Sequence, residues 1–257
     1  MIVKANDDCR QEVLAIQLMK RLQQIFNKAE IPLWMRPYEI FVTSSSSAMI
    51  EFIPETMSIS ALKKKMKENG NPKLMNLRQF YKWYFHEKFE EAQQNFIRSL
   101  AAYSLFTYLF AIKDRHNGNI MLDRSGHIIH IDFGFMLQNT PGGVNFESAP
   151  FKLTADYVDL MDGSDSDKFE NFKSLLCRGL IEVRRNLDDL ANFITIMSKH
   201  SSMPCFKNTE TVIKEIQQRL QVPNLPENNK RNEMYELTER ITNQSLNSFF
   251  TNQYDNF

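Results

Sequence analysis

The residues most able to do chemistry are concentrated in one short stretch, where polar and charged side chains stand between two apolar segments. Residues 114–119 read DRHNGN, and they lie between an apolar run that ends at Ile112 and the apolar residues 120–122. Asp132 follows a second short apolar run and begins the tripeptide Asp-Phe-Gly. Burying such groups without partners costs several kcal/mol each. We therefore expect them to face a cleft, a metal ion or a ligand.

The spacing of these residues suits phosphoryl transfer. Asp114 and Asn119 stand five residues apart, as the Asp and Asn of a kinase catalytic loop do, and Asp-Phe-Gly follows after one predicted hairpin. Magnesium prefers hard oxygen ligands, which the amide of Asn119 and the carboxylate of Asp132 can supply. Either Asp114 or His116 could accept the proton of an attacking hydroxyl group, and the sequence leaves this choice open.

A cation that would neutralise phosphate charge is predicted near the N-terminus. Lys4 follows the short apolar run of residues 1–3, and Glu12 lies in the predicted helix that comes next. Kinases commonly hold a phosphate-binding lysine by an ion pair with a helical glutamate. We therefore predict an ion pair between Lys4 and Glu12.

Each of these signals also has an ordinary structural explanation when it is taken alone. A single Asp-Phe-Gly recurs by chance in many chains, and Asp114 with Arg115 would be a surface ion pair worth under about 1 kcal/mol. His130 stands between two isoleucines, which is more typical of a core residue. The combination, at this spacing and with a hairpin between its parts, favours a catalytic site.

Apolar periodicity predicts the first elements that must position these residues. A helix is expected over residues 8–29, with Asp8 as its N-cap and Gln11 as the partner in a capping box. Two strand-like runs, residues 39–43 and 49–53, follow, and a serine-rich turn joins them. This part of the chain is therefore a small unit of helix and sheet.

The rest of the chain is predominantly helical by the same criteria. The lysine-rich residues 63–67 are more typical of a solvated helix face than of a binding patch. A long buried helix is expected over residues 89–113, and short strands over residues 120–122 and 128–132. Beyond residue 153 the pattern indicates helices, with breaks at prolines. The chemical residues thus lie on a hairpin between a small mixed lobe and a larger helical lobe.

Composition excludes several classes of protein. The chain has 31 basic and 31 acidic side chains among 257 residues, so we expect no nucleic-acid partner. Three scattered cysteines predict neither a disulfide framework nor a zinc site. The apolar run over residues 99–112 has 14 residues, fewer than the roughly 18 that a membrane span needs. We expect a cytoplasmic protein whose membrane contacts are peripheral.

In their order and length these motifs resemble the phosphoinositide 3- and 4-kinases, a family of lipid kinases, over nearly the whole chain. Ile2-Val3-Lys4 and residues 7–12 (DDCRQE) resemble the family's lysine strand and its D-D-L-R-Q-D/E segment. The other matching segments are Arg36-Pro37-Tyr38 (P-Y segment), residues 49–53 (connector between lobes), 114–119 (D-R-H-N-x-N catalytic loop) and 130–134 (H-I-D-F-G metal motif). Residues 151–154 and 203–206, with Gly134-Phe135, narrow the resemblance to type III phosphatidylinositol 4-kinases, nearer beta than alpha.

The resemblance implies an α+β, two-lobed kinase-like fold. Residues 1–53 would form a small mixed α/β N-lobe that ends in a hinge, and residues 54–257 a larger, mainly helical C-lobe. The catalytic loop is expected at residues 114–119 and the activation segment at residues 132–153. The family's phosphate-covering loop and several strands precede the lysine strand. We therefore expect an incomplete N-lobe with an exposed sheet edge, and weak or no activity of these residues in isolation.

The resemblance also implies roles for single residues. Lys4 would contact the phosphates of ATP, with Glu12 orienting it and Tyr38 lining the pocket. Asp114 and His116 would serve the catalytic loop, and Asn119 and Asp132 would hold Mg²⁺ or, alternatively, Mn²⁺. The adenine contacts implied are backbone groups of Glu51 and Ile53 and the apolar side chains of Ile50, Met121 and Ile131.

The implied reaction transfers the γ-phosphate of ATP to the 4-hydroxyl of phosphatidylinositol. The alternatives are a non-catalytic kinase-like scaffold, a phosphoinositide 3-kinase, or a protein kinase of the same superfamily. Phosphatidylinositol in membranes and ATP are the implied substrates, small GTPases or other membrane recruiters the implied partners, and the Golgi the implied membrane address.

The activation segment bears on the substrate independently of the resemblance. After Asp132 it carries one basic residue, Lys152, and one acidic residue, Glu147. A kinase for inositol that already bears phosphomonoesters needs clustered Lys or Arg there, so the segment favours unphosphorylated phosphatidylinositol. Two apolar groups remain open to a lipid-facing or an interior role: Phe135, Met136, Phe146 and Phe151 of the segment, and the aromatic residues of the C-terminal stretch 246–257.

Overall fold

The computed structural model describes residues 1–70, 76–140, 149–221 and 232–248. Phe146 and Glu147 of the activation segment, and all but the start of the aromatic C-terminal stretch 246–257, therefore lie outside the described residues. Within these described ranges, no helix is both long enough and apolar enough to cross a membrane.

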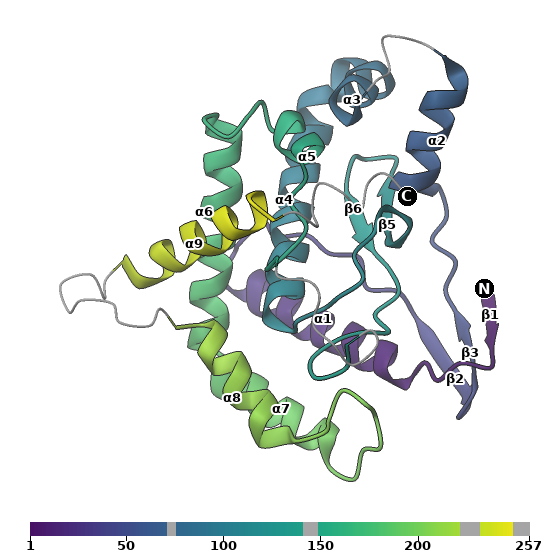
Figure 1. The fold of residues 1–257 in the computed structure, drawn as a ribbon, viewed down its shortest axis with the longest axis vertical. Helices are drawn as coiled ribbons and strands as arrows, with labels where there is room; N and C mark the ends of the chain where they lie inside the picture. Colours follow the sequence, from purple (N-terminus) through teal and green to yellow (C-terminus); the bar gives the residue numbers. More distant parts are fainter. Residues whose placement is uncertain (71–75, 141–148, 222–231, 249–257) are drawn as a thin grey trace.

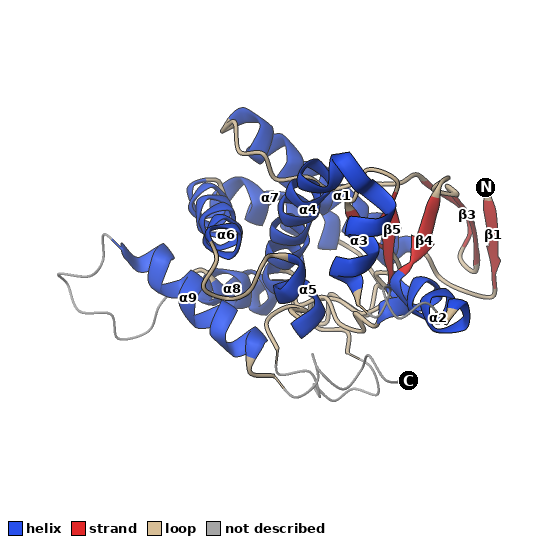
Figure 2. Ribbon diagram, turned by 90° about the horizontal axis from the view of Figure 1, so that it is seen from above, coloured by secondary structure: helices blue, strands red, loops and turns tan. Residues whose placement is uncertain are grey.

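The chain folds into helices packed beside two small antiparallel sheets (Figure 1). Seen from above, the strands gather at one side of the molecule and most helices at the other (Figure 2). In chain order the elements are β1 (Ile2–Ala5), α1 (Arg10–Lys28), β2 (Ile40–Ser44), β3 (Ser47–Ile50), β4 (Thr56–Ser58), α2 (Ile59–Asn69), α3 (Leu77–Phe85), η1 (His86–Lys88), α4 (Phe89–Leu109), η2 (Asn117–Asn119), β5 (Ile120–Asp123), β6 (Ile128–His130), α5 (Ala155–Leu160), α6 (Asp167–Arg185), α7 (Leu187–Ser198), α8 (Thr209–Arg219) and α9 (Glu233–Leu246).

The first sheet has the strand order β1-β3-β2, so β1 and β2 are its edges. Lys4 of β1 pairs with Ala48 of β3, which is buried. Apolar side chains on this sheet remain in contact with solvent, among them Val3, which is 73% exposed, and Phe41, which is 54% exposed. The second sheet, β4-β5-β6, follows in the chain and packs through β6 against α4.

Helix α4 lies at the centre of the helical part and contacts α3, α6 and β6. Phe96, Leu100, Tyr103 and Phe106 are buried, as their spacing predicted. The helix ends at Leu109, four residues before the predicted end at residue 113. Ala111 takes a positive φ of 47° just beyond it, which turns the chain toward the polar loop.

The predicted capping box of α1 is wrong. The helix begins at Arg10 with Cys9 as its N-cap, and the Cys9 side chain makes no capping hydrogen bond. The carboxylate of Asp8 accepts from the backbone N–H of Arg10 at 3.1 Å and from its guanidinium at 2.8 and 2.6 Å. The helix nevertheless packs against β2 and α6 with a fully buried apolar stripe that includes Leu14, Leu18 and Leu22.

These observations confirm the predicted α+β fold class, a small mixed region followed by a larger helical one. Both sheets are antiparallel, and the predicted hairpin strands occur as β5 and β6. One continuous apolar cluster connects α1 with the helices that follow, so the helical part and the small mixed part share a core.

Candidate active site

The hairpin β5–β6 brings Asn119 and Asp132 to the same end of the sheet. Ile120 pairs with His130, and the N–H of Ile131 donates to the carbonyl of Asn119 at 3.0 Å. Asn119 therefore enters the hairpin at the point where Asp132 leaves it. Residues that were predicted to act together are thus brought together by strand register.

Asn119 is oriented with its amide oxygen available. The side chain is buried, and its Nδ2 donates to the carbonyl of Asp114 at 3.0 Å. Because the amide nitrogen is used in this way, Oδ1 points elsewhere, and within the described ranges it has no hydrogen-bond donor. The carboxylate of Asp132 is exposed, while the following Phe133 is fully buried.

The backbone at the two acidic positions is unusual. Asp114 has a φ of 62° and Asp132 a φ of 60°. Aspartate tolerates this left-handed region better than most residues do, and such conformations concentrate at functional sites. At Asp132 the turn buries Phe133 and leaves the carboxylate toward solvent.

Arg115 joins the polar loop of residues 114–119 to residues 131–133. The sequence alone did not predict this role of Arg115. Its guanidinium is buried and donates to the carbonyls of Ile131, at 2.8 Å, and of Asp132. It also lies over the ring of Phe133, 5.3 Å from the centroid. The guanidinium is therefore not at the surface, as the alternative of a surface ion pair assumed, and it holds backbone carbonyls.

Gln11 of α1 is a second positioning residue. Its amide donates to the carbonyls of Phe133, at 3.3 Å, and of Gly134, at 2.5 Å, and its oxygen accepts from Asn139 at 3.3 Å. Gln11 was predicted to close a capping box, but it fixes the segment after Asp132 instead. A polar residue on the buried face of a helix was the available signal.

His116 and Asp114 lie beside each other at the mouth of the loop. His116 Nε2 is 3.9 Å from Asp114 Oδ2, and both side chains are more than one third exposed, at 41% and 37%. The other ring nitrogen, Nδ1, accepts a hydrogen bond from the N–H of Gly118 at 3.0 Å. Nδ1 therefore carries a lone pair, and the neutral ring bears its proton on Nε2.

Lys4 and Glu12 do not form the predicted ion pair. Lys4 Nζ pairs with Asp7 Oδ2 at 2.7 Å, and Glu12 Oε1 accepts from the hydroxyl of Tyr38 at 2.5 Å. Burial lowers the pKa of Lys4, but Asp7, Glu12 and Asp132 together outweigh it and raise the pKa above its ordinary value. Glu12 thus acts on Lys4 through its charge rather than through a contact.

Tyr38 connects Glu12 to the backbone of Asp132. It is almost completely buried, and besides donating to Glu12 its hydroxyl accepts from the N–H of Asp132 at 3.3 Å. Burial beside Glu12 raises the pKa of Tyr38 well above its ordinary value, so the hydroxyl stays protonated. Tyr38 is therefore a bridge between Glu12 and Asp132, whereas the resemblance implied that it lines the pocket.

We predict that Glu12→Gln stabilises the fold. Burial raises the pKa of Glu12, although Tyr38 and Lys4 oppose the shift. The folded chain therefore holds this proton more tightly than the unfolded chain, so the stability that Glu12 contributes falls as pH rises from its ordinary pKa through the raised one. Glutamine keeps the acceptor for Tyr38 and removes the buried charge.

We expect a gain on the order of 1 kcal/mol at pH 7 that shrinks toward pH 4, measured by urea unfolding. Asp7→Asn is the matched control, because Asp7 is exposed and should change stability by less than about 0.5 kcal/mol. A loss of stability in Glu12→Gln at pH 7 would contradict the prediction.

The connector after β3 leaves two backbone groups accessible. The N–H of Glu51 donates to the carbonyl of Glu39 at 2.8 Å. The Glu51 carboxylate accepts from the N–H of Glu39, also at 2.8 Å, and pairs with Arg36. Within the described ranges, the carbonyl of Glu51 and the N–H of Ile53 have no hydrogen-bond partner. Glu51 and Ile53 are the residues whose backbone groups were predicted to contact adenine.

Three half-buried apolar side chains were predicted to form adenine walls. Asn119 pairs with Ile131 and Met121 with Ile129, so Met121 and Ile131 lie on one face of the hairpin. Ile50 lies on β3, directly before the connector, and is also half-buried. The opposite face of the hairpin, with Ile120 and Ile128, is fully buried.

The described part of the activation segment is largely interior. Met136 and Phe151 are buried, which favours the interior role over the lipid-facing one, and Phe135 is half-buried. Lys152, the basic residue of the segment, is also buried. A cavity of about 590 Å³ borders the segment at Leu137 and Thr140, and its lining includes three cations from other elements: Lys113, Lys207 and Arg219.

The metal-binding capacity of the site is small on its own. Among the residues that the structure describes, no group of three or more His, Cys, Asp or Glu side chains converges on a point. One amide oxygen from Asn119 and one carboxylate from Asp132 fit the way Mg²⁺ is held in phosphoryl-transfer enzymes, where nucleotide phosphates and water complete the shell.

Residues 1–208 match the family described as "Phosphatidylinositol 3- and 4-kinase". The chain is 44% identical to "Phosphatidylinositol 4-kinase" of Dictyostelium discoideum over its whole length, which is 21% of that protein. It is 44% identical over 99% of its length to "Phosphatidylinositol 4-kinase beta 2" of Arabidopsis thaliana, covering 22% of that protein. It is 41% identical over its whole length to "Phosphatidylinositol 4-kinase beta" of Sorex araneus, covering 31% of that protein. The chain therefore belongs to the phosphatidylinositol 3- and 4-kinase family.

Proposed function

We propose that this chain is the catalytic core of a lipid kinase that transfers the γ-phosphate of ATP to the 4-hydroxyl of phosphatidylinositol. The observation that carries the proposal is the hairpin that sets Asn119 and Asp132 side by side next to Asp114 and His116. Relatives named phosphatidylinositol 4-kinase, at 41 to 44% identity, support the lipid substrate and the position of transfer.

ATP would bind between an N-lobe of residues 1–53 and a C-lobe of residues 54–257. Adenine would use the carbonyl of Glu51 and the N–H of Ile53, against the apolar side chains of Ile50, Met121 and Ile131. Lys4 would contact the phosphates. The raised pKa of Lys4 supports this role, because the ammonium stays charged when phosphate approaches.

Asn119 and Asp132 would hold Mg²⁺ or Mn²⁺, which neutralises phosphate charge during transfer. Arg115 would keep the segment after β6 in place through the carbonyls of Ile131 and Asp132. Gln11 would do the same from α1 through the carbonyl of Gly134. These two residues are positioning residues, since they contact the backbone.

Asp114 is the better candidate for the base. The lone pair of His116 at Nδ1 is occupied by the N–H of Gly118, so Nε2 bears a proton and faces the loop mouth as a donor. A carboxylate at Asp114 can accept the proton of the attacking hydroxyl. His116 would then donate to the phosphoryl oxygens as charge develops.

The described activation segment supports phosphatidylinositol as the substrate. Its basic residue, Lys152, is buried and not available to bind a headgroup. Phosphomonoesters on the inositol would require several charge-assisted donors. The single phosphodiester of phosphatidylinositol requires fewer, and the cavity beside the segment offers Lys207 and Lys113.

The kinase would associate peripherally with membranes, where its substrate resides. Recruitment by small GTPases or other membrane proteins and a Golgi-type address remain predictions from family resemblance. The scaffold alternative requires loss of nucleotide chemistry. It is disfavoured because Lys4, Asp114, Asn119 and Asp132 are all present.

The test is a lipid kinase assay of the full-length gene product that contains these residues. Phosphatidylinositol vesicles, radiolabelled ATP and Mg²⁺ are combined, and the 3- and 4-phosphate products are separated by chromatography. We expect phosphatidylinositol 4-phosphate. A 3-phosphate product would indicate a 3-kinase, and the absence of both product and nucleotide binding would indicate a scaffold.

A further inference from the structure

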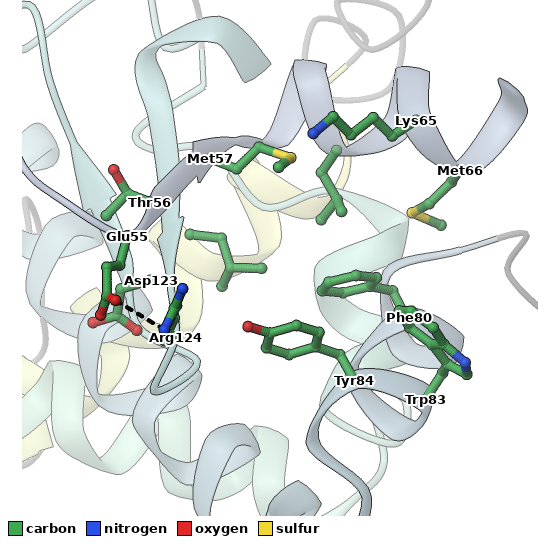
Figure 3. A pocket seen from close by; sticks show the side chains of 12 residues that line it. Glu55, Thr56, Met57, Lys65, Met66, Phe80, Trp83, Tyr84, Asp123 and Arg124 are labelled. Atoms are coloured by element: carbon green, nitrogen blue, oxygen red, sulfur yellow. Dashed lines mark ion pairs between the residues drawn. The ribbon is translucent and has the colours of Figure 1, made fainter. Parts of the chain in front are cut away.

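A second cavity, unrelated to the residues above, lies between β4, α2, α3 and β5 (Figure 3). Its volume is about 450 Å³, within the range of small-molecule sites. Met57 and Leu122 pair across β4 and β5 and line it. Because side chains alternate along a strand, the cavity lies on the face of this sheet opposite Met121.

The lining is apolar and partly aromatic. Phe80, Trp83 and Tyr84 come from α3, and Phe80 stacks on Tyr84 with ring centroids 5.3 Å apart. Trp83 is 50% exposed and Tyr84 43% exposed, although rings of this size are usually buried. Two methionines complete the walls, and their unbranched side chains adapt to different ligand shapes.

The charged groups stand at the edges of this cavity (Figure 3). At one edge Arg124 pairs with Glu55 at 2.8 Å, and Asp123 with His127 at 3.1 Å. At another edge lies the exposed Lys65 of α2. Within the described ranges Lys65 has no ion-pair partner. The carboxylate of Glu55 is thus paired with a cation, and that of Asp123 is held by the ring of His127. The ammonium group of Lys65 is the cation that has no acidic partner in the described ranges.

We propose that this cavity binds a single-chain lipid carboxylate, with its aliphatic chain against the apolar walls and its carboxylate against Lys65. One available cation matches one negative charge, whereas a phosphate monoester calls for several charge-assisted donors. Each CH₂ group of the chain that is buried against the apolar walls strengthens binding. The lysine-rich segment of α2, whose sequence is more typical of a solvated face than of a binding patch, therefore includes one ligand-binding residue.

The cavity is connected to the proposed nucleotide site through the chain itself. β4 begins at Thr56, three residues after Ile53, and its partner β5 carries Met121. A ligand against Met57 and Leu122 would therefore press on the sheet that also bears the adenine wall. Such a ligand would therefore change the affinity for nucleotide. This coupling rests on the proposed function, whereas the binding of the ligand to the cavity does not.

Binding is tested by the fluorescence of Trp83. The chain has two tryptophans, and the other, Trp34, stacks on His127. Trp34→Phe leaves Trp83 as the only reporter, and sodium dodecanoate is titrated below its critical micelle concentration. We expect a saturable change in emission. If Trp34→Phe folds poorly, binding of dodecanoate to the unsubstituted chain is measured by calorimetric titration.

Two lysines of α2 provide a matched pair of variants. Lys65→Glu places a negative charge at the rim and should weaken binding by about tenfold or more, because the interaction changes sign. Lys64→Glu makes the same charge change at a neighbouring side chain that is 78% exposed and does not line the cavity. It should leave the affinity unchanged within about twofold.

The ligand head is tested with chains of equal length. Dodecyltrimethylammonium should bind at least about tenfold more weakly than dodecanoate to the unsubstituted chain, and Lys65→Glu should reverse this order. Equal binding of both ions, or equal effects of the two lysine variants, would overturn the proposal in favour of non-specific hydrophobic adsorption. Absence of saturable binding by calorimetry would also overturn it. Saturable binding to this chain, together with no kinase activity of the full-length gene product, would contradict the proposed function alone.

Discussion

Replacing Asp132 with asparagine in the full-length gene product is expected to lower kcat for phosphatidylinositol phosphorylation by about 10³-fold. The carboxylate is one of the two groups proposed to hold a metal ion at the end of the hairpin, and an amide there is a weaker, neutral ligand. Metal coordination supplies several kcal/mol of stabilisation to the charge of the transition state, and each 1.36 kcal/mol corresponds to a factor of ten.

Asparagine is the informative replacement because the backbone at this position has a φ of 60°. Asparagine tolerates this region, whereas alanine adds backbone strain of about 1 kcal/mol. The N–H and carbonyl of Asp132, which contact Tyr38 and Arg115, are retained. The fold should therefore remain intact, as checked by the midpoint of thermal unfolding.

Asp165→Asn serves as the control, since it removes the same charge from an exposed position. Its activity should match that of the unsubstituted protein. If Asp132→Asn keeps more than about one tenth of the activity, the assignment of Asp132 as a metal ligand is wrong.

The elements were predictable where local pattern and tertiary structure agree. The hairpin strands follow from short apolar runs around a turn, and their register fixes Asn119 and Asp132 together. Helix α4 follows from its unbroken apolar spacing. These features depend on neighbours in sequence, so one chain is sufficient to predict them.

The errors arose where a distant or competing side chain took a partner. Asp8 would have capped α1, but the adjacent guanidinium of Arg10 binds its carboxylate. Glu12 was predicted to pair with Lys4, but its carboxylate accepts a hydrogen bond from the hydroxyl of Tyr38, 26 residues away in the sequence. The roles of Arg115 and Gln11 likewise depend on carbonyls brought close only by the fold.

The cavity at Trp83 could not be predicted for the same reason. Its lining comes from four elements between Glu55 and Arg124, and no spacing rule relates them. A cluster of aromatic residues on α3 was the available signal, and such clusters are more often core. Two features distinguish this cavity from a core cluster: its aromatic rings are half-exposed, and Lys65 at its edge has no ion-pair partner among the described residues.

A second large effect is expected from Asp114→Asn, which should lower kcat by about 10² to 10⁴-fold, the range of general-base catalysis. Asparagine tolerates the φ of 62° at this position, and the carbonyl that holds Asn119 is unchanged. The metal ligand therefore stays oriented. The loss should appear in kcat, while KM for ATP changes by less than about threefold, because the proton acceptor does not bind the nucleotide.

Variants of His116 test whether Asp114 or His116 is the base. If Nε2 donates to the phosphoryl group, His116→Gln retains a donor amide and should keep at least about tenfold more activity than His116→Ala. If His116 were the base, both variants would lose the proton acceptor and would be equally impaired, and Asp114→Asn would be the milder change. Because Nδ1 is held by the N–H of Gly118, the ring cannot release Nε2 as an acceptor without losing that bond. The expected order of activity is therefore His116→Gln above His116→Ala, and both above Asp114→Asn.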